Sequence, residues 1–276
     1  MSNYTKLSIS TTEEQGEILI AYLSDYPFDS FDYEGELLNG YIPQAEFAEC
    51  REAVEELLHN EGILDFYFEE IKQQNWNAAW ESNFDEVEVQ DKVLIRAPFH
   101  KAHPHYNGLE IIIQPKMSFG TGHHATTRLM VESLLEMDLQ RKQVLDMGSG
   151  TGVLAIVAAK LGAESVLAVE VDEMAEESVR ENIELNEVGS RVVSICGDAS
   201  AIEGKLFDIV LANINRNVLL ADMRAYVATL VKKGVLVISG FLEEDIPLLL
   251  RTAKSLGLKY IGKLVCNEWR AIKFRK

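Results

Sequence analysis

Apolar and polar residues follow two different periods in the first 70 residues. Runs that alternate with a period of two are typical of half-buried strands. These runs are 6–9, 28–33, 36–42 and 63–70. Between these runs, apolar residues recur at helical spacing in two segments, which predicts two helices. The first helix follows Thr11, which forms a capping box with Glu14, and the second begins at Pro43. The order β-α-β-β-α-β predicts a small ferredoxin-like α+β domain.

A longer pattern begins near residue 144, where short apolar runs alternate with segments of helical period. This alternation favours a Rossmann-like α/β architecture, with helices on both faces of a parallel sheet. The last two apolar runs, 258–265 and 269–274, have only three residues between them, so we expect an antiparallel hairpin there. The other runs expected to be strands are 87–98, 109–114, 144–146, 166–171, 192–196, 209–213 and 235–239.

Between the two patterns, residues 73–84 are polar and carry Trp76 and Trp80 four positions apart. Residues at this spacing share one side of a helix, so we expect a linker helix whose two indole rings pack on a neighbouring domain. A chain of 276 residues is also long enough for two ordinary domains. The expected parts are a small domain at 1–70, a linker helix at 71–86 and a larger domain at 87–276.

Charge divides the chain in nearly the same way. The formal net charge of −18 comes from 26 Lys and Arg against 44 Asp and Glu. Residues 1–90 hold 21 of the acids and only three cations, which are Lys6, Arg51 and Lys72, so the whole excess lies there. Binding to a phosphate backbone needs clustered cations, which argues against nucleic acid as the partner. The acidity indicates either a well-solvated surface or a docking surface for a basic protein.

Cysteine usage and the N-terminus indicate the compartment. Cys50, Cys196 and Cys266 are far apart and form no disulfide framework or CxxC pair, which fits a reducing cytosol. The first residues show no basic region followed by an apolar stretch, and no apolar run reaches about 18 residues. We therefore expect a cytoplasmic protein without membrane contact, and we expect it to be a monomer.

The strongest chemical motif is the segment 144–152, which has the sequence VLDMGSGTG. An apolar strand leads into a glycine-rich turn, and a helix follows from Val153. Glycine lets the backbone approach a ligand closely, and the next helix offers free N–H groups at its N-terminus. The spacing G-x-G-x-G is not the dinucleotide fingerprint, whose third glycine would stand at Val153, and the turn lacks the Lys-Ser/Thr of a P-loop.

Polar residues follow each of the next three predicted strands. Glu170 ends the first, and an acid there can accept hydrogen bonds from both ribose hydroxyls of an adenosine ligand. Asp198 follows the second and could meet an adenine edge, and Asn213 ends the third. An acid after one strand is more often a helix cap, but ligands of open α/β sheets bind at these carboxyl ends. The succession of such residues predicts an adenosine-type cofactor site.

With these residues, the chain resembles the class I S-adenosylmethionine-dependent methyltransferases. The segment 119–127, FGTGHHATT, narrows the resemblance. It is similar to the F-G-T-G-x-H-x-T-T signature of the bacterial methyltransferases of large-subunit ribosomal protein eleven. The predicted ferredoxin-like domain, the tryptophan-bearing linker and the chain length also match that family, so the resemblance covers essentially the whole chain.

The resemblance implies S-adenosyl-L-methionine as the cofactor. Thr127, at the start of the helix after the loop, and Gly148 would lie near its methionine end. Glu170 replaces the Asp common in the family and would bind the ribose. Asn213 matches the family's Asn-Ile, but residues 215–217 depart from its usual Leu-Ala-Gly. The expected cofactor-binding residues are Thr127, Gly148, Gly150, Glu170, Asp198 and Asn213.

The resemblance also implies methyl transfer to lysine side chains and the N-terminal amine of the ribosomal protein, which would dock on the acidic domain at 1–70. Such an in-line displacement needs mainly positioning and exclusion of water. The acceptor must be a neutral amine, although the pKa of a free lysine is about 10.4. Asn213 is the expected catalytic residue, since its side-chain carbonyl could orient the amine. His123 and His124 are alternative proton acceptors, but a loop-positioning role is favoured for them.

Two other functions stay open at this point. An RNA or small-molecule methyltransferase could use the same core, but an RNA substrate predicts a basic patch in residues 1–90, where the charge is the reverse. A module that binds the cofactor without catalysis is the other, although the intact glycine turn argues against it. His100, His103 and His105 form H-x-x-H-x-H, but no Cys or carboxylate spacing supports a metal site, and we expect none.

Overall fold

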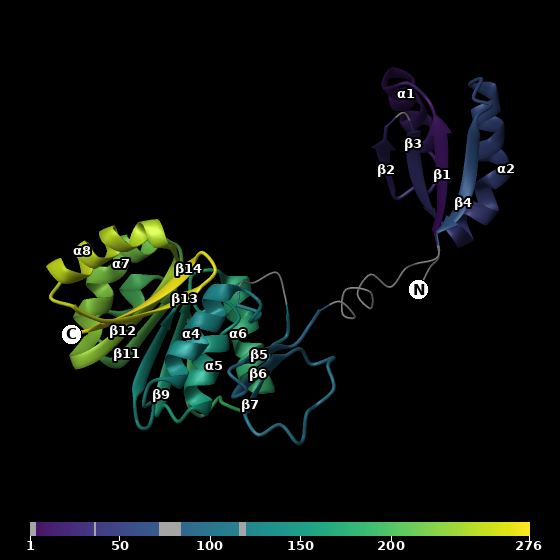
Figure 1. Ribbon diagram of the computed structural model, residues 1–276. Coiled ribbons are helices and arrows are strands. Elements are labelled where there is room, and N and C mark those ends of the chain that lie inside the picture. The colour runs from purple at the N-terminus through teal and green to yellow at the C-terminus, as the bar shows by residue number, and fades with distance from the viewer. Residues whose placement is uncertain (1–3, 36, 72–83, 116–119) are drawn as a thin grey trace. The chain divides into compact units, whose positions relative to one another are not determined.

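The computed structural model describes residues 4–35, 37–71, 84–115 and 120–276. The chain divides into two compact units, Met1–Phe84 and Asp85–Lys276, each with its own hydrophobic core (Figure 1). The predicted linker helix with Trp76 and Trp80 lies outside the described residues.

The first unit is a four-stranded antiparallel sheet with two helices. Its elements are β1 (Tyr4–Ser10), α1 (Glu13–Leu23), β2 (Ser30–Glu34), β3 (Leu37–Pro43), α2 (Gln44–Asn60) and β4 (Phe66–Ile71). The strand order β2-β3-β1-β4 confirms the ferredoxin-like prediction. Leu7 and Leu38 of the sheet share one buried cluster with Leu19 of α1 and Leu58 of α2, so both helices cover the same face.

The predicted start of α1 is wrong by one residue. Thr12, not Thr11, is the N-cap, and its hydroxyl oxygen accepts a hydrogen bond from the backbone N–H of Gln15 at 3.4 Å. The Thr11 hydroxyl bonds instead to Thr12 O and to Gln15 Oε1. Two adjacent threonines both satisfy the local pattern, and the backbone conformation decides which one caps the helix. Pro43 ends β3 and directly precedes α2.

The second unit is built on a seven-stranded sheet. Its strands are β8 (Gln143–Met147), β9 (Ser165–Glu170), β10 (Val192–Cys196), β11 (Phe207–Asn213), β12 (Leu230–Leu242), β13 (Lys259–Cys266) and β14 (Trp269–Arg275). The order is β10-β9-β8-β11-β12-β14-β13, and only the pairings of β14 are antiparallel. This confirms the Rossmann-like sheet with a C-terminal antiparallel hairpin.

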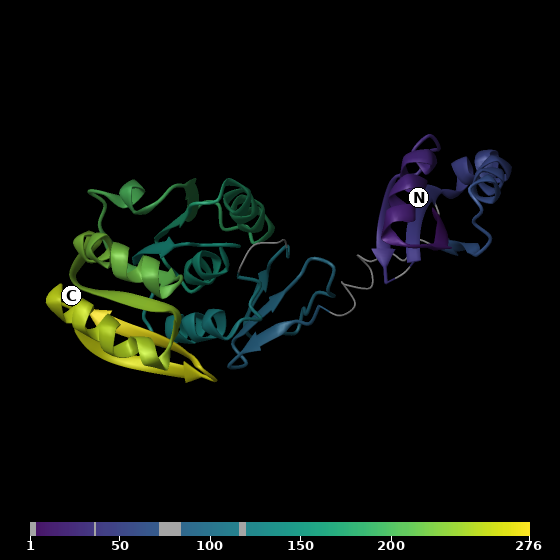
Figure 2. The ribbon, with the colours of Figure 1, turned by 90° about the horizontal axis from the view of Figure 1, so that it is seen from above.

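Helices cover both faces of this sheet (Figures 1 and 2). They are α4 (Ala125–Leu135), α5 (Val153–Lys160), α6 (Glu173–Leu185), α7 (Arg216–Thr229) and α8 (Ile246–Ser255), with 3-10 turns η1 (Ala199–Ile202) and η2 (Glu243–Asp245). Adjacent residues of β8 point to opposite faces: Val144 packs with α4, α5 and α6, whereas Leu145 packs with α7 and α8. The two faces therefore carry separate hydrophobic clusters.

A three-stranded sheet precedes α4. It consists of β5 (Val87–Val89), β6 (Val93–Arg96) and β7 (Leu109–Ile112), in that order. The run 87–98 was predicted as one strand, but it forms two, because Gln90 and Asp91 have φ values of 54° and 53° and turn the chain back. Strand β7 pairs with β6 on one edge only.

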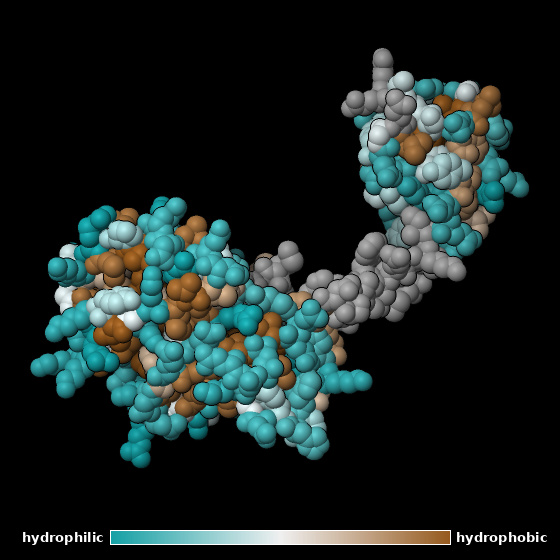
Figure 3. Space-filling model, in the orientation of Figure 1, coloured by the Kyte–Doolittle hydropathy of each residue, from teal (hydrophilic) through white to brown (hydrophobic). Residues whose placement is uncertain are grey.

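The described surface is mixed in character. On the visible face of each unit in Figure 3, hydrophilic residues project between smaller hydrophobic areas. Among the residues that the structure describes, no helix has both the length and the apolar character needed to cross a bilayer.

Candidate active site

The four strands that were predicted to carry the site are neighbours. β10, β9, β8 and β11 lie next to one another and run parallel, so their carboxyl ends meet at one edge of the sheet. The structure thereby places Gly148, Glu170, Asp198 and Asn213 at that edge. In open α/β sheets this edge is where ligands bind.

The glycine turn between β8 and α5 needs its glycines for two reasons. Gly148, Gly150 and Gly152 have φ values of 69°, 56° and 79°, in the left-handed region that favours glycine. The neighbours also leave no room for a side chain, since a Cβ on Gly148 would lie 2.3 Å from Cγ2 of Ile214. One on Gly152 would lie 2.8 Å from Cγ1 of Val179.

Ile214, which follows Asn213, is held between two glycine backbones. Gly148 approaches its side chain, and Gly240 of β12 approaches its main chain, where an added Cβ would lie 2.2 Å from Ile214 O. Gly240 has φ of 96° and coincides with an irregularity in the pairing of β12 and β14. The position of Asn213 therefore depends on both glycines. Sequence reasoning missed Gly240; the available signal was a glycine directly after a predicted strand.

Glu170 is anchored to backbone N–H groups through both carboxylate oxygens. Oε2 accepts a hydrogen bond from Gly150 N–H at 2.8 Å, and Oε1 accepts one from Val171 N–H at 2.9 Å. An ionised carboxylate has about four lone-pair sites, so it can also accept hydrogen bonds from ribose hydroxyls. These bonds fix the carboxylate next to the glycine turn.

Asp198 and Asn215 cap the helical segments beside the site. Oδ1 of Asp198 accepts a hydrogen bond from Ser200 N–H at 2.8 Å, and bonding to Ser200 lowers the pKa of Asp198. Oδ1 of Asn215 accepts hydrogen bonds from Asn217 and Val218 N–H groups at 3.1 and 3.2 Å and caps α7. The departure at residues 215–217 thus supplies a helix cap.

Several buried oxygens around the glycine turn have no hydrogen-bond partner among the described residues. They are Thr127 Oγ1, Asp146 Oδ1, Ser149 Oγ and Asn213 Oδ1. An unpaired buried polar group costs about 1–3 kcal/mol, so a ligand that offers hydrogen-bond donors would recover part of that cost. S-adenosylmethionine carries an ammonium group and ribose hydroxyls, and these donors fit such a set of acceptors.

Asp146, two residues before Gly148, is fully buried. Its Oδ2 accepts a hydrogen bond from Ala155 N–H in α5 at 3.1 Å. Burial raises the pKa of Asp146 to about 7; the bond from Ala155 opposes this shift, and the charge of Glu170 adds to it. Sequence reasoning did not single out this carboxyl group, because only the fold shows that it is excluded from water.

The loop motif docks on the glycine turn. The Thr151 hydroxyl donates a hydrogen bond to Gly120 O at 2.7 Å. Seven residues later, Thr127 is the third residue of α4, as predicted, and it is fully buried. The structure therefore joins the two motifs that were identified separately in the sequence.

His123 and His124 both hold this loop in place. Nδ1 of His124 accepts hydrogen bonds from the hydroxyl and the N–H of Thr126, at 2.7 and 3.3 Å, and the residue caps α4. Its ring packs edge-on against Trp269, and burial lowers the pKa of His124. Nε2 of His123 donates to Asp85 O at 2.9 Å. These contacts support the loop-positioning role over the role of proton acceptor.

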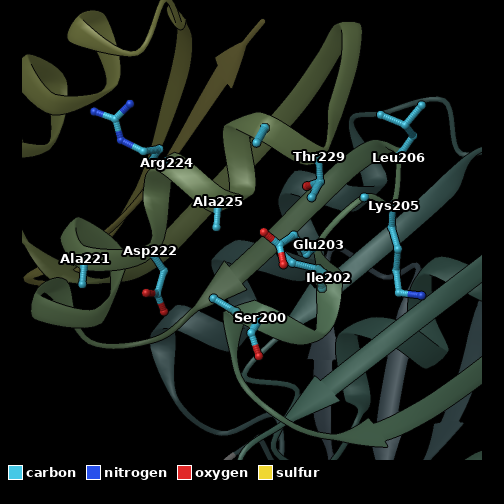
Figure 4. Close-up of a pocket in the computed structure, with 13 residues that line it drawn as sticks. Ser200, Ile202, Glu203, Lys205, Leu206, Ala221, Asp222, Arg224, Ala225 and Thr229 are labelled. Atoms are coloured by element: carbon cyan, nitrogen blue, oxygen red, sulfur yellow. The ribbon is translucent and has the colours of Figure 1, made fainter.

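Hollows in the described surface lie outside this constellation, and two of them border elements of the site. One of about 520 Å³ lies between η1 and α7, with Ser200, Glu203 and Asp222 around it (Figure 4). Another of about 400 Å³ lies between the start of α4 and the β13–β14 turn, next to Trp269. None of the expected cofactor-binding residues lines either hollow. The candidate cofactor site is therefore described by the strand ends and loops that carry those residues.

The histidine-rich loop does not form a metal centre in the described part of the chain, where no group of three or more His, Cys, Asp or Glu is arranged to hold an ion. Instead, Nε2 of His103 lies 2.9 Å from the Glu86 carboxylate, and Nδ1 of His100 accepts a hydrogen bond from Ala97 N–H at 3.1 Å.

The strand order and the glycine turn after β8 define the class I methyltransferase fold. The family model "Ribosomal protein L11 methyltransferase (PrmA)" matches residues 3–276, and the chain belongs to this family. It is 45% identical over 268 residues to the ribosomal protein L11 methyltransferase of Porphyromonas gingivalis, covering 96% of this chain and 92% of the relative. Identity to that of Bacteroides thetaiotaomicron is 40%, covering 95% of each.

A solved structure shows the same likeness. The ribosomal protein L11 methylase of Lactobacillus delbrueckii subsp. bulgaricus superimposes with a TM-score of 0.65 at 25% identity, covering 70% of this chain and 100% of that one.

The raised pKa of Asp146 predicts a pH-dependent effect of Asp146→Asn on stability. In the native state the carboxyl group keeps its proton up to about pH 7, whereas in the unfolded chain it loses it near 3.8. Ionisation therefore destabilises the native protein as the pH rises through this window. We expect Asp146→Asn to gain stability relative to wild type by a few kcal/mol between pH 4 and 7, since one pKa unit is about 1.4 kcal/mol.

Urea denaturation at several pH values measures this difference. Asp91→Asn removes the same charge at an exposed position and serves as the control. A stability difference between Asp146→Asn and wild type that stays constant from pH 4 to 8 would contradict the assignment.

Proposed function

We propose that this chain is an S-adenosyl-L-methionine-dependent N-methyltransferase that methylates lysine side chains and the N-terminal amine of ribosomal protein L11. The observation that carries the proposal is the edge of the sheet where the glycine turn, Glu170 and Asn213 lie beside buried oxygens that have no hydrogen-bond partner within the described ranges. Membership in the ribosomal protein L11 methyltransferase family supports the choice of acceptor protein.

The expected cofactor-binding residues would contact different parts of the ligand. The Glu170 carboxylate would accept hydrogen bonds from the ribose, and Asp198 lies after the next strand, where the adenine would reach. Thr127, Gly148 and Gly150 would surround the methionine end. When bound, the cofactor supplies a methyl group on a positively charged sulfur, from which it can be displaced.

Asn213 is the residue that we assign to the acceptor amine. Its Oδ1 is buried and has no hydrogen-bond partner in the part of the chain that the structure describes, so it can accept a hydrogen bond from the amine nitrogen and direct the nitrogen lone pair. The amine must be neutral to attack, and burial favours its neutral form. The amine nitrogen that Asn213 orients would take the methyl group and then give up one proton to water, while the sulfur would keep the electron pair of the broken carbon–sulfur bond.

The acidic first unit would recognise the acceptor protein. Its helix α2 exposes Glu46, Glu49, Glu52 and Glu56, and the described part of the unit has few cations to offset them. A negative surface attracts a basic protein and raises the rate of encounter. The same charge opposes direct binding to nucleic acid. We propose a cytoplasmic monomer that makes no contact with membranes.

Gly148→Ala tests the cofactor site. The new methyl group would overlap Ile214 and strain a backbone with φ of 69°, so we expect affinity for S-adenosylmethionine to fall at least about tenfold, or about 1.4 kcal/mol. Calorimetry measures this affinity. Gly257→Ala is the matched control, since its φ is 85° but an added Cβ meets nothing within 4 Å. Equal affinities in the two variants would refute the assignment.

Mass spectrometry of ribosomal protein L11 after incubation with enzyme and cofactor tests the reaction. We expect mass increments of one methylene unit each, located by peptide mapping at lysines and at the N-terminal amine. Asn213→Ala should lower the rate about tenfold or more, as when about 1.4 kcal/mol of transition-state stabilisation is lost. Methyl transfer to ribosomal RNA with none to the protein would favour the alternative function instead.

Charge neutralisation tests the docking role of the first unit. Replacing Glu49, Glu52 and Glu56 by Gln should raise KM for the acceptor protein several-fold and weaken its salt dependence, since exposed pairs contribute about 0.2–1 kcal/mol each. The control replaces Glu177, Glu184 and Glu187, which are exposed in or just after α6, in the same way. Steady-state kinetics at two salt concentrations measure KM for the acceptor protein in both triple variants. Identical KM values in the two variants would count against a docking role for the first unit.

A further inference from the structure

The outer edge of strand β7 is bound by side chains of two helices instead of by another strand. Lys160 of α5 donates from Nζ to Glu110 O at 2.7 Å. Asn186, which caps the C-terminus of α6, accepts from Ile112 N–H at 2.9 Å and donates from Nδ2 to Ile112 O at 2.6 Å. Alternate residues of a strand present their backbone groups to the same edge, so these side chains take the place of a neighbouring strand.

Asn182, one helical turn before Asn186, links the end of this strand to the glycine turn. It is fully buried, and its Oδ1 accepts a hydrogen bond from Gln114 N–H at 2.8 Å. Its Nδ2 donates to Thr151 O at 2.9 Å. The side-chain amide of Asn182 therefore bonds to the segment after β7 through its oxygen and to the glycine turn through its nitrogen. These two bonds fix the distance between the segment and the turn.

Thr151 makes the next link. It is also fully buried, and it binds Asn182 through its carbonyl oxygen and Gly120 O through its hydroxyl. Gly120 lies directly against it, since a Cβ there would be 2.8 Å from Thr151 Oγ1. The chain from Gly120 leads to α4 and to Thr127, whose buried hydroxyl has no hydrogen-bond partner among the residues that the structure describes.

We propose that Asn182 and Thr151 are positioning residues, which set the segment 120–127 against the glycine turn and so preorganise the cofactor site. Loops that are already held in their bound positions lose less conformational freedom when a ligand binds, which increases affinity. The inference rests on the proposed function, because it takes the glycine turn as the cofactor site.

Substitutions at Thr151 test this link in the ligand-free protein. Thr151→Val removes the hydroxyl and keeps the shape, whereas Thr151→Ser keeps the hydroxyl. Thr229→Val is the control, since the Thr229 hydroxyl is buried at the end of α7 and donates to Tyr226 O at 2.9 Å. We expect faster amide hydrogen exchange in residues 120–127 for Thr151→Val alone. Unchanged exchange in that variant would overturn the proposal.

Affinity for S-adenosylhomocysteine, the methylation product, gives a second readout by calorimetry. We expect Thr151→Val to bind about tenfold more weakly, or about 1.4 kcal/mol, and Thr151→Ser to stay within about twofold of wild type. The cofactor KM should rise while kcat at saturating cofactor stays nearly the same, because the link acts on binding. Equal affinity of Thr151→Val and wild type would overturn the proposal and leave the proposed function standing.

A comparison of Asn182→Ala with Asn186→Ala distinguishes two roles: the connection of Asn182 to the glycine turn, and the binding of strand β7 by either asparagine. Asn186 holds the strand but does not contact the glycine turn, so Asn186→Ala should keep its affinity for S-adenosylhomocysteine while Asn182→Ala loses it. Equal losses would show that the strand matters and the link does not. Wild-type protein that fails to bind S-adenosylhomocysteine at all would contradict the proposed function as well as the inference.

Discussion

The close approach of three backbone segments at the carboxyl edge of the sheet is the constraint on which the site depends. Gly148 and Gly240 contact Ile214 from two sides, and neither position has room for a Cβ. Packed interiors tolerate few voids and few overlaps, so this contact fixes where β8, β11 and β12 end relative to one another. Asn213, which precedes Ile214, is thereby held at the edge, and its buried side-chain oxygen has no hydrogen-bond partner among residues 4–35, 37–71, 84–115 and 120–276.

Buried polar groups that find no hydrogen-bond partner among the described residues lower the stability of a protein, and several of them lie together here. Asp146 adds a fully buried carboxyl group whose pKa is raised by burial to about 7. Such features collect at functional sites, where a bound ligand can compensate for them. Without a ligand, the two hydrophobic clusters on the faces of the sheet offset this loss of stability in the second unit.

The two units differ in charge and in packing. The first unit has a small core beneath one face of its sheet and carries nearly all of the excess acidity. The second has 23 Lys and Arg against 26 Asp and Glu, so it is much closer to neutral, and it carries the glycine turn. The proposed recognition of a basic protein and the proposed binding of a cofactor have different electrostatic requirements, and two units of different charge would satisfy both.

The order of elements could be predicted from the sequence, because hydrophobic period is local. The strands 192–196 and 209–213 and the C-terminal hairpin lie where the pattern indicated. Local choices between similar residues could not be predicted: Thr12 rather than Thr11 caps α1, and a turn at Gln90 and Asp91 divides one apolar run into two strands. Backbone conformation decides both.

The sequence by itself determined the fold class and the placement of the glycine turn, Glu170 and Asn213 at the ends of successive strands, since the α/β pattern fixes their spacing. Only the tertiary structure decided which groups support them. Asn182 meets Gln114 across 68 positions of the chain, and Thr151 meets Gly120 across 31. Such contacts follow from how the helices and loops pack, and no local period encodes that packing.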